Sequence, residues 1–255
     1  MRLFRLSLAI SLLTLLPLAA IAAEDEEAAL IEEEAKISFA QEFDFGSQYV
    51  WRGFAQTRGP VLQPEASLSI YDLTLNLWAN LVLNDEPHQG QFTEVDPSID
   101  YYLHFGDLEI QPSFEYYFYP SQVDSPSTGE LSLWLAYALG PVKLFTDHIF
   151  DVVRYGGAYF GDLGISHERD LCKKLGLRTS GAIGWASPKF NGTYGGISKA
   201  AFNVFLWDLE LNYRPWKHFY VRPHMQVSVL LDPDLRSNAS DPTILSGGLA
   251  LGFTF

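Results

Sequence analysis

A two-residue alternation of apolar and polar side chains recurs along this sequence, and it limits the fold more than any other feature. In LTLNLWANLVL, residues 73–83, every odd-numbered position is Leu or Ala, and the even-numbered positions hold Thr, Asn, Trp, Asn and Val. Successive side chains of a β-strand point to opposite faces, so the segment is predicted to be a strand. A helix would scatter these leucines around its whole circumference.

The same alternation predicts twelve strands, at 37–53, 60–71, 73–83, 95–105, 108–118, 129–139, 141–150, 155–166, 174–185, 200–213, 218–231 and 244–255. Most have about the ten residues that a tilted strand needs to cross a bilayer. Tight turns, including 167–172 and 213–217, alternate with long polar connections at 84–92, 119–128, 186–197 and 232–243. The joint near 151–154 is too short for this scheme, so ten or fourteen strands are the alternatives.

We therefore expect an all-β fold, a transmembrane antiparallel up-and-down β-barrel. The alternative is a secreted β-sandwich or a lipocalin-like barrel, in which the apolar faces pack together in a dry core. Three features oppose it. The apolar faces are long and continuous, aromatic side chains gather near strand ends as in interfacial girdles, and the opposite faces carry charges deep within strands.

The first 22 residues have the features of a secretory signal peptide. Arg2 and Arg5 precede an apolar run and a small-residue cleavage site near Ala22. A membrane anchor is the alternative, which Pro17 and the acidic residues after the run disfavour. We expect a signal peptide at 1–22, an acidic periplasmic tail at 23–36 and an outer-membrane barrel at 37–255 of a Gram-negative bacterium.

Composition excludes several classes of function. The chain has one cysteine, Cys172, so an intramolecular disulfide framework is ruled out, and no Cys/His cluster indicates zinc. The formal net charge of −14 argues against nucleic acid, which proteins bind through basic surfaces. No cofactor and no metal is predicted.

The final segment ILSGGLALGFTF places an apolar face on alternate residues and ends on Phe255. It resembles the terminal strand of bacterial outer-membrane proteins, which closes with an aromatic residue that the barrel-assembly machinery reads. The expected partners are therefore that machinery, the lipid and lipopolysaccharide of the outer membrane, and small solutes.

Arg52 lies among aromatic residues in SQYVWRGFAQTRGP, residues 47–60. At the end of a first strand it would point into a wet lumen and pair with carboxylates, while Trp51 or Tyr49 faces lipid headgroups. Two roles are open. Arg52 either forms a structural ion pair that ties the first extracellular loop to the wall, or lines a constriction.

The opening strands resemble those of a known family. Residues 43–81 are similar to the start of TorF-type porins and, more distantly, of MltA-interacting-protein barrels, through a Tyr-x-x-Arg-Gly element, a Pro and Gln, and a strand carrying Trp. Here these are Tyr49, Arg52, Gly53, Pro60, Gln63, Pro64 and Trp78. The resemblance covers mainly the first three strands and the terminal Phe. It implies an outer-membrane barrel with a transport function, and it brings no catalytic residues.

Assigning the polar faces to the lumen predicts its charged lining. The acids are Glu42, Asp44, Glu94, Asp96, Asp100, Glu109, Glu115, Glu130, Asp147, Asp208 and Glu210, and the bases are Lys143, Arg178, Arg214, Arg222 and His224. Together with Arg52 these are the candidate pore-lining residues. Acids concentrate on the fourth to sixth strands and bases on the ninth to eleventh, so opposite walls would set up a transverse field. In the alternative, the charges pair into networks that fill a narrow barrel.

These observations predict a porin-like channel for passive diffusion of small polar or charged solutes, with a non-conducting structural barrel as the alternative. A lipid hydrolase is disfavoured, because it needs a histidine that activates a serine. None of the six histidines is followed two residues later by serine, although a cross-strand pair is left open.

Overall fold

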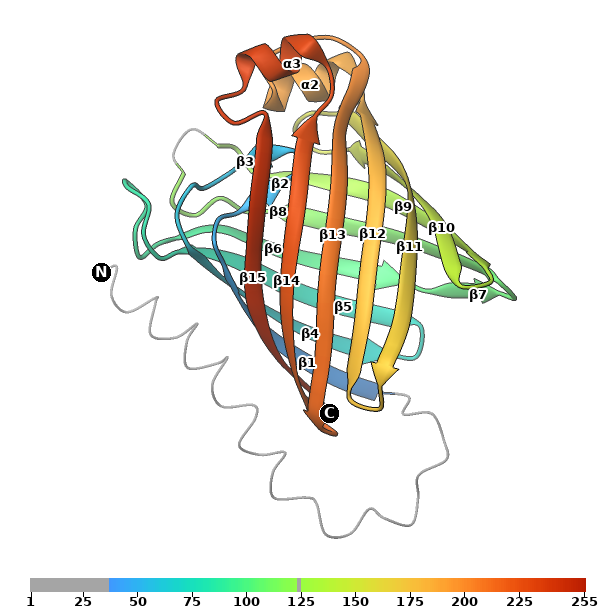
Figure 1. Ribbon diagram of the computed structural model, residues 1–255. Coiled ribbons are helices and arrows are strands. Elements are labelled where there is room, and N and C mark those ends of the chain that lie inside the picture. Colours follow the sequence, from blue (N-terminus) through green and yellow to red (C-terminus); the bar gives the residue numbers. More distant parts are fainter. Residues whose placement is uncertain (1–36, 123–124) are drawn as a thin grey trace.

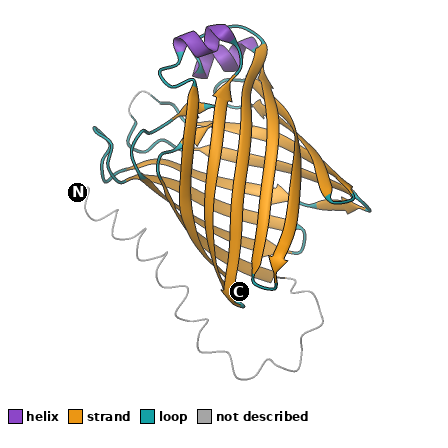
Figure 2. Cartoon of the chain, viewed as in Figure 1, coloured by secondary structure: helices purple, strands orange, loops and turns teal. Residues whose placement is uncertain are grey.

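The structure is a computed structural model that describes residues 37–122 and 125–255. Figures 1 and 2 show a barrel of long strands with the short helices α2 (Pro188–Tyr194) and α3 (Pro233–Asn238) at one end. We call this the helical end, and the opposite end, where tight turns join the strands, the turn end. The predicted signal peptide and acidic tail lie outside the described residues. No helix in the described part is long and apolar enough to cross a membrane.

Twelve antiparallel strands form the closed wall of the described part, each paired with its neighbours in chain order. They are β1 (Ile37–Gly46), β4 (Val61–Ile70), β5 (Leu73–Val82), β6 (Phe92–Tyr101) with its continuation β7 (Leu103–Phe105), β8 (Leu108–Tyr117), β9 (Thr128–Leu139), β10 (Val142–Asp151), β11 (Tyr159–Cys172), β12 (Leu175–Ala186), β13 (Ala201–Trp216), β14 (Phe219–Leu230) and β15 (Thr243–Thr254). β6 and β7 both pair with β8, so they are one interrupted strand. The predicted fold class and strand number are confirmed.

The first and last strands close the ring. β1 pairs with β15 in a register that sets Gln41 opposite Phe253 and Gly46 opposite Gly248. The Phe39 and Phe255 backbones exchange hydrogen bonds of 3.0 and 2.8 Å. Because every wall strand of the described part pairs with a strand on each side, the wall satisfies its own backbone hydrogen bonds, as a strand structure surrounded by lipid must.

Apolar side chains cover the outside of the barrel, and the polar faces of the strands point inward. Leu75 and Leu77 are 43% and 45% exposed, whereas Thr74 between the odd-numbered leucines is buried and Asp100 on the neighbouring strand is only 8% exposed. A sandwich or a lipocalin-like barrel would bury these leucines and expose the carboxylate. The structure therefore contradicts that alternative.

Some predicted boundaries were wrong. The first strand ends at Gly46 rather than at residue 53, and the chain then forms a separate hairpin of β2 (Val50–Trp51) and β3 (Phe54–Ala55). Residues 167–172 and 213–217 were predicted to be turns, but β11 continues to Cys172 and β13 to Trp216. Paired strands satisfy their backbone groups in register, so polar sequence alone did not end them.

Two predicted loops contain helices that the alternation could not show. Ser187 accepts a hydrogen bond from the backbone of Phe190 at the start of α2, and Asp232 accepts two at the start of α3. Each cap is followed by Pro at the first turn, which is favourable there because Pro has no N–H to leave unpaired. At the joint near residues 151–154, which was predicted to be too short, β11 begins only at Tyr159. The Asp151 carboxylate holds this connection by accepting hydrogen bonds from the backbone amides of Val153 and Tyr155.

A lipid-covered exterior makes the cost of a charge depend on its depth. Leu77→Arg, in the middle of β5, is expected to lower the free energy of unfolding by about 2–4 kcal/mol, and Leu139→Arg, beside a turn at the end of β9, by ~0–1 kcal/mol. Urea unfolding in phospholipid vesicles measures both. Equal, small effects at the two positions would contradict a bilayer around the barrel.

Candidate functional site

Most bases in the barrel interior are bound by a carboxylate on a nearby strand. The Lys143 ammonium lies 2.8 Å from Glu109, and His224 lies 2.9 Å from Asp44. Arg222 contacts Glu42 at 2.5 Å and Glu210 at 3.8 Å. These pairs neutralise the bases locally, so the interior resembles the paired network rather than two walls of opposite charge.

Arg52 stands at the tip of the β2–β3 hairpin and not at the end of a barrel strand, which corrects the sequence-based prediction. Arg52 and Gly53 have φ values of 46° and 93°, as the two central residues of a type I′ hairpin turn require. A Cβ at Gly53 would lie 2.9 Å from Leu230 Cδ2 and 3.0 Å from Val204 Cγ2. Glycine is therefore needed twice, for the backbone conformation and because the tip presses against β13 and β14.

The guanidinium of Arg52 holds the hairpin to the opposite side of the lumen. Its Nη1 and Nη2 donate to the two carboxylate oxygens of Glu130 on β9, at 2.9 and 2.6 Å. The two side chains are only 12% and 4% exposed. The Tyr117 hydroxyl donates to Glu130 at 2.8 Å, and the Trp51 ring lies 4.3 Å from the guanidinium carbon. The expected ion pair between the first loop and the wall is present.

Trp51 or Tyr49 was expected to face lipid headgroups, and that expectation was wrong, because both rings lie inside the barrel. The Trp51 ring packs on Phe190 and Tyr194 of α2, with centroid distances of 5.7 and 4.9 Å. The Tyr49 ring lies 5.3 Å from that of Trp78. The two rings turn inward because the hairpin folds over the lumen, where aromatic and aliphatic side chains are available to bury them.

An apolar plug fills one side of the lumen at the helical end. Its buried residues are Ile149, Ala158, Phe160, Ala186, Phe190, Val204 and Leu230, and Trp51 and Phe54 of the hairpin pack against them. Asn203 donates a hydrogen bond to Asn191 of α2. Lys199 binds Asp232 and Asp234 at 2.8 Å each, and these hydrogen bonds raise the pKa of Lys199 and lower that of Asp232. The helices are thus fastened over the plug.

Two polar cavities lie on the other side of the hairpin. The first, of about 140 Å³, is lined by Gln56, Asp85, Glu86, His88 and Glu94 among others. The second, of about 260 Å³, lies deeper and is lined by Trp51, Glu65, Trp78, Asp96, Glu115 and Tyr117 among others. Tyr49 lines both cavities and so separates them. The hairpin therefore divides the helical end into a filled side and a polar side.

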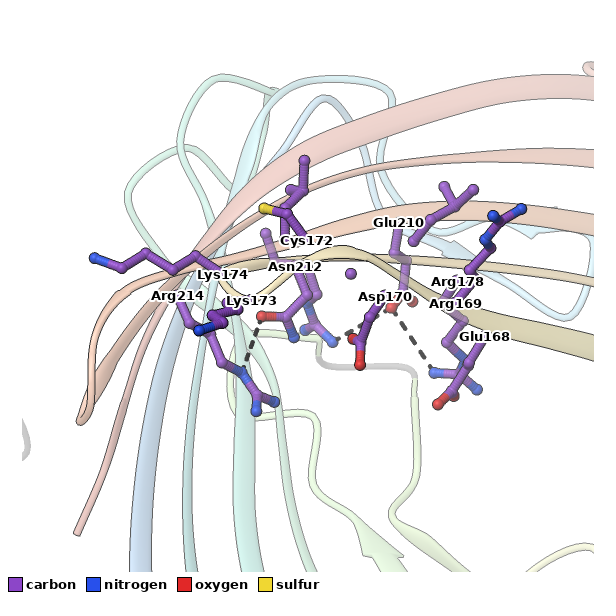
Figure 3. Close-up of a pocket in the computed structure, with 14 residues that line it drawn as sticks. Glu168, Arg169, Asp170, Cys172, Lys173, Lys174, Arg178, Glu210, Asn212 and Arg214 are labelled. Carbon is purple, nitrogen blue, oxygen red and sulfur yellow. Dashed lines mark hydrogen bonds and ion pairs between the residues drawn. The ribbon is translucent and has the colours of Figure 1, made fainter.

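A third cavity, of about 540 Å³, opens at the turn end between β11 and β14 (Figure 3). Arg178 of β12 and Arg222 of β14 both reach Glu210 of β13 at 3.8 Å. Arg169, Lys173, Lys174 and Arg214 add positive charge around it, and the Arg214 side chain donates to Asn212 at 3.2 Å. Bases outnumber acids in this lining.

The predicted lining residues differ in their surroundings. Glu94, Asp96 and Glu115 line the polar cavities beside the hairpin, and Arg178, Glu210 and Arg222 line the cavity at the turn end. Asp100 accepts hydrogen bonds from the side-chain amides of Asn76 and Gln111. Asp208 accepts one from the side-chain amide of Gln226. Glu109, Glu130 and His224 are engaged in the ion pairs above, and Asp147 is partly buried beside Asp162.

Sequence reasoning missed the aromatic members of the site. On their strands, Trp78 and Tyr117 occupy the same alternate positions as the polar residues. This pattern was the available signal that their side chains point inward. Nothing in the sequence placed Tyr49 between two cavities, because its position depends on how the hairpin folds back.

The barrel has the fold of solved porins. It is similar to the "KdgM porin" with 10% identity, 85% of this chain and 99% of that chain covered, and a TM-score of 0.53. It is also similar to the NanC porin, with 9% identity, coverage of 84% and 98%, and a TM-score of 0.54. At this identity the likeness concerns the fold alone. No family model and no curated protein sequence matches the chain.

Removing one partner of the Arg52–Glu130 pair leaves a nearly buried charge alone. Arg52→Met is therefore expected to lower the opening free energy of the hairpin by about 3–5 kcal/mol. Hydrogen exchange of the Gln56 amide, which donates to the Tyr49 carbonyl at 2.8 Å, reports this opening.

The matched control is Arg58→Met, which breaks an ion pair to Asp241 whose side chains are 64% and 49% exposed. Its expected effect is below ~1 kcal/mol. Similar effects of the two variants would show that the Arg52–Glu130 pair does not hold the hairpin.

Proposed function

We propose that this chain is an outer-membrane channel for passive diffusion of small polar or charged solutes. The observation that carries the proposal is an interior lined by polar groups and holding three polar cavities, inside a barrel whose outer face is apolar. Lipid outside and water inside is the one arrangement that satisfies both faces. The helical end would face the medium and the turn end the periplasm.

The comparisons support this proposal through the fold. The two similar structures are both described as porins, and a third, with a TM-score of 0.50 and 10% identity, is a KdgM porin in complex with disordered oligogalacturonate. The lining of the present chain differs from what an acidic oligosaccharide would need at the helical end, because carboxylates line the two cavities there. We infer that solutes pass the hairpin on its acidic side.

The apolar plug favours a second candidate, a structural barrel that does not conduct. Its side chains are buried, and the hairpin and both helices lie over the same part of the lumen. In that case the ion pairs of the interior serve stability alone.

A lipid hydrolase has less support. Within residues 37–122 and 125–255 no histidine is hydrogen bonded to a serine. His148 contacts the Tyr159 and Thr146 hydroxyls, His167 and His218 contact backbone carbonyls, and His224 contacts Asp44. The arrangement that activates a serine nucleophile is therefore not formed there.

Four further predictions from the sequence belong to this proposal. They are membership of the TorF-type porins, export through a cleaved signal peptide, contact with lipopolysaccharide, and recognition of the last strand by the barrel-assembly machinery. The Tyr-x-x-Arg-Gly element of residues 43–81 forms the hairpin that folds into the lumen.

Purified protein in a planar bilayer under a KCl gradient is expected to show single channels whose reversal potential indicates preference for K⁺ over Cl⁻. The physical reason is that Arg52, the base at the tip of the hairpin, is paired with Glu130, while Glu94 and Asp96 beside the hairpin form no ion pair in the described part of the chain. Glu94→Gln with Asp96→Asn is expected to lower the permeability ratio severalfold.

Asp72→Asn with Asp107→Asn, in two exposed turns outside the lumen, removes the same number of carboxylates and is expected to leave the ratio unchanged. Absence of current from correctly folded protein would overturn the channel and support the structural barrel.

A further inference from the structure

We propose that the deeper cavity beside the hairpin binds a small organic cation, one that carries an alkylated ammonium group. We call this the aromatic–carboxylate cavity, defined by Tyr49, Glu65, Trp78, Asp96, Glu115 and Tyr117. The inference deepens the proposed channel by naming the class of solute that its lining would recognise, and it rests on that function only for its biological meaning.

Strand pairing sets the carboxylates and one aromatic ring side by side on the inner face. Glu65 of β4 lies opposite Trp78 of β5, which lies opposite Asp96 of β6. Directly opposed residues of antiparallel strands share a face with their Cβ atoms about 4.5–5.5 Å apart. The tryptophan is therefore flanked by a carboxylate on each neighbouring strand.

The cavity has carboxylates that form no ion pair with a base in the described part of the chain. No described residue that lines it is basic, and neither Glu65 nor Asp96 forms an ion pair within the described part of the chain. Asp96 is only 3% exposed, and its Oδ1 has no hydrogen-bond partner among the described residues. A buried carboxylate oxygen without a partner is costly, and a bound cation would supply the missing interaction.

Arg52, which follows the lining residue Trp51 in the chain, is already engaged. Both of its terminal nitrogens donate to Glu130, so its charge is neutralised at that residue. The contact of its guanidinium with the Trp51 ring shows in addition that aromatic faces at this level of the lumen accept a cation.

The aromatic lining favours an organic cation over a metal ion. The centroids of the Tyr49 and Trp78 rings lie 5.3 Å apart, and the ring planes make an angle of 55°. The two rings therefore form an angled aromatic surface beside the carboxylates. Aromatic surfaces of this kind bind alkylated ammonium groups through cation–π attraction. In the described residues no group of three or more His, Cys, Asp or Glu is arranged to hold a metal ion. The volume of about 260 Å³ accommodates a cation larger than a bare ion.

Isothermal titration of the full-length protein in detergent with choline tests the proposal. We expect binding at one site, and binding of the neutral isostere 3,3-dimethylbutan-1-ol at least about tenfold weaker because it lacks the charge. Asp96→Asn is expected to weaken choline binding about tenfold, which corresponds to ~1.4 kcal/mol. Trp78→Leu, which removes the ring but keeps all carboxylates, is expected to weaken it by a similar factor.

Asp208→Asn is the matched control, since Asp208 is an interior carboxylate outside this cavity that is hydrogen bonded to Gln226. It is expected to leave choline binding unchanged, and circular dichroism checks that each variant keeps its strands. Equal binding of choline and its isostere, displacement of choline by equimolar Ca²⁺, or wild-type affinity in both Asp96→Asn and Trp78→Leu would each overturn the proposal.

The outcomes separate this inference from the proposed function. Choline binding without any single-channel current would overturn the channel and leave the cavity as a binding site. Current without choline binding would overturn the cavity and leave the channel.

Discussion

The rest of the structure depends on the pairing of β1 with β15. Lipid offers no hydrogen bonds, so a wall of strands is stable there only when its first and last strands meet. That closure fixes two environments at once, because alternate side chains must then point to lipid or to the lumen. Leu75 and Leu77 and the buried Asp100 follow from the same constraint, and so does the accumulation of paired charges inside.

The hairpin after β1 folds into the lumen of the closed barrel and divides it. Gly53 allows the tip to press on Val204 and Leu230, and the Arg52–Glu130 pair fastens it from the other side. The apolar side chains then have a partner and form a plug, while the carboxylates of β4, β6 and β8 border the space that remains. The side of the hairpin that stays polar then determines the selectivity for solutes.

Much of the fold could be predicted from the sequence because period-two alternation is a local property, and the closed, lipid-facing arrangement follows from it. The alternation at 73–83 located β5 within one residue. The hairpin could not be predicted, because Tyr49, Val50 and Trp51 look like continued strand, and their inward position depends on distant partners such as Phe190 and Trp78. The pairing of the interior charges could not be predicted either, because it depends on strand register, which alternation leaves open.

Site-directed spin labels placed singly along residues 73–82, with Cys172 replaced by Ser, test the central claim that lipid lies outside this barrel and water inside. For protein in phospholipid vesicles, the account predicts that labels at odd-numbered positions collide mainly with oxygen dissolved in lipid. Labels at the even-numbered positions 76 and 78, whose native side chains line a cavity inside the barrel, should collide mainly with a water-soluble nickel complex. Odd-numbered labels shielded from both reagents, with even-numbered labels open to bulk water, would place the leucines in a dry core and contradict the account.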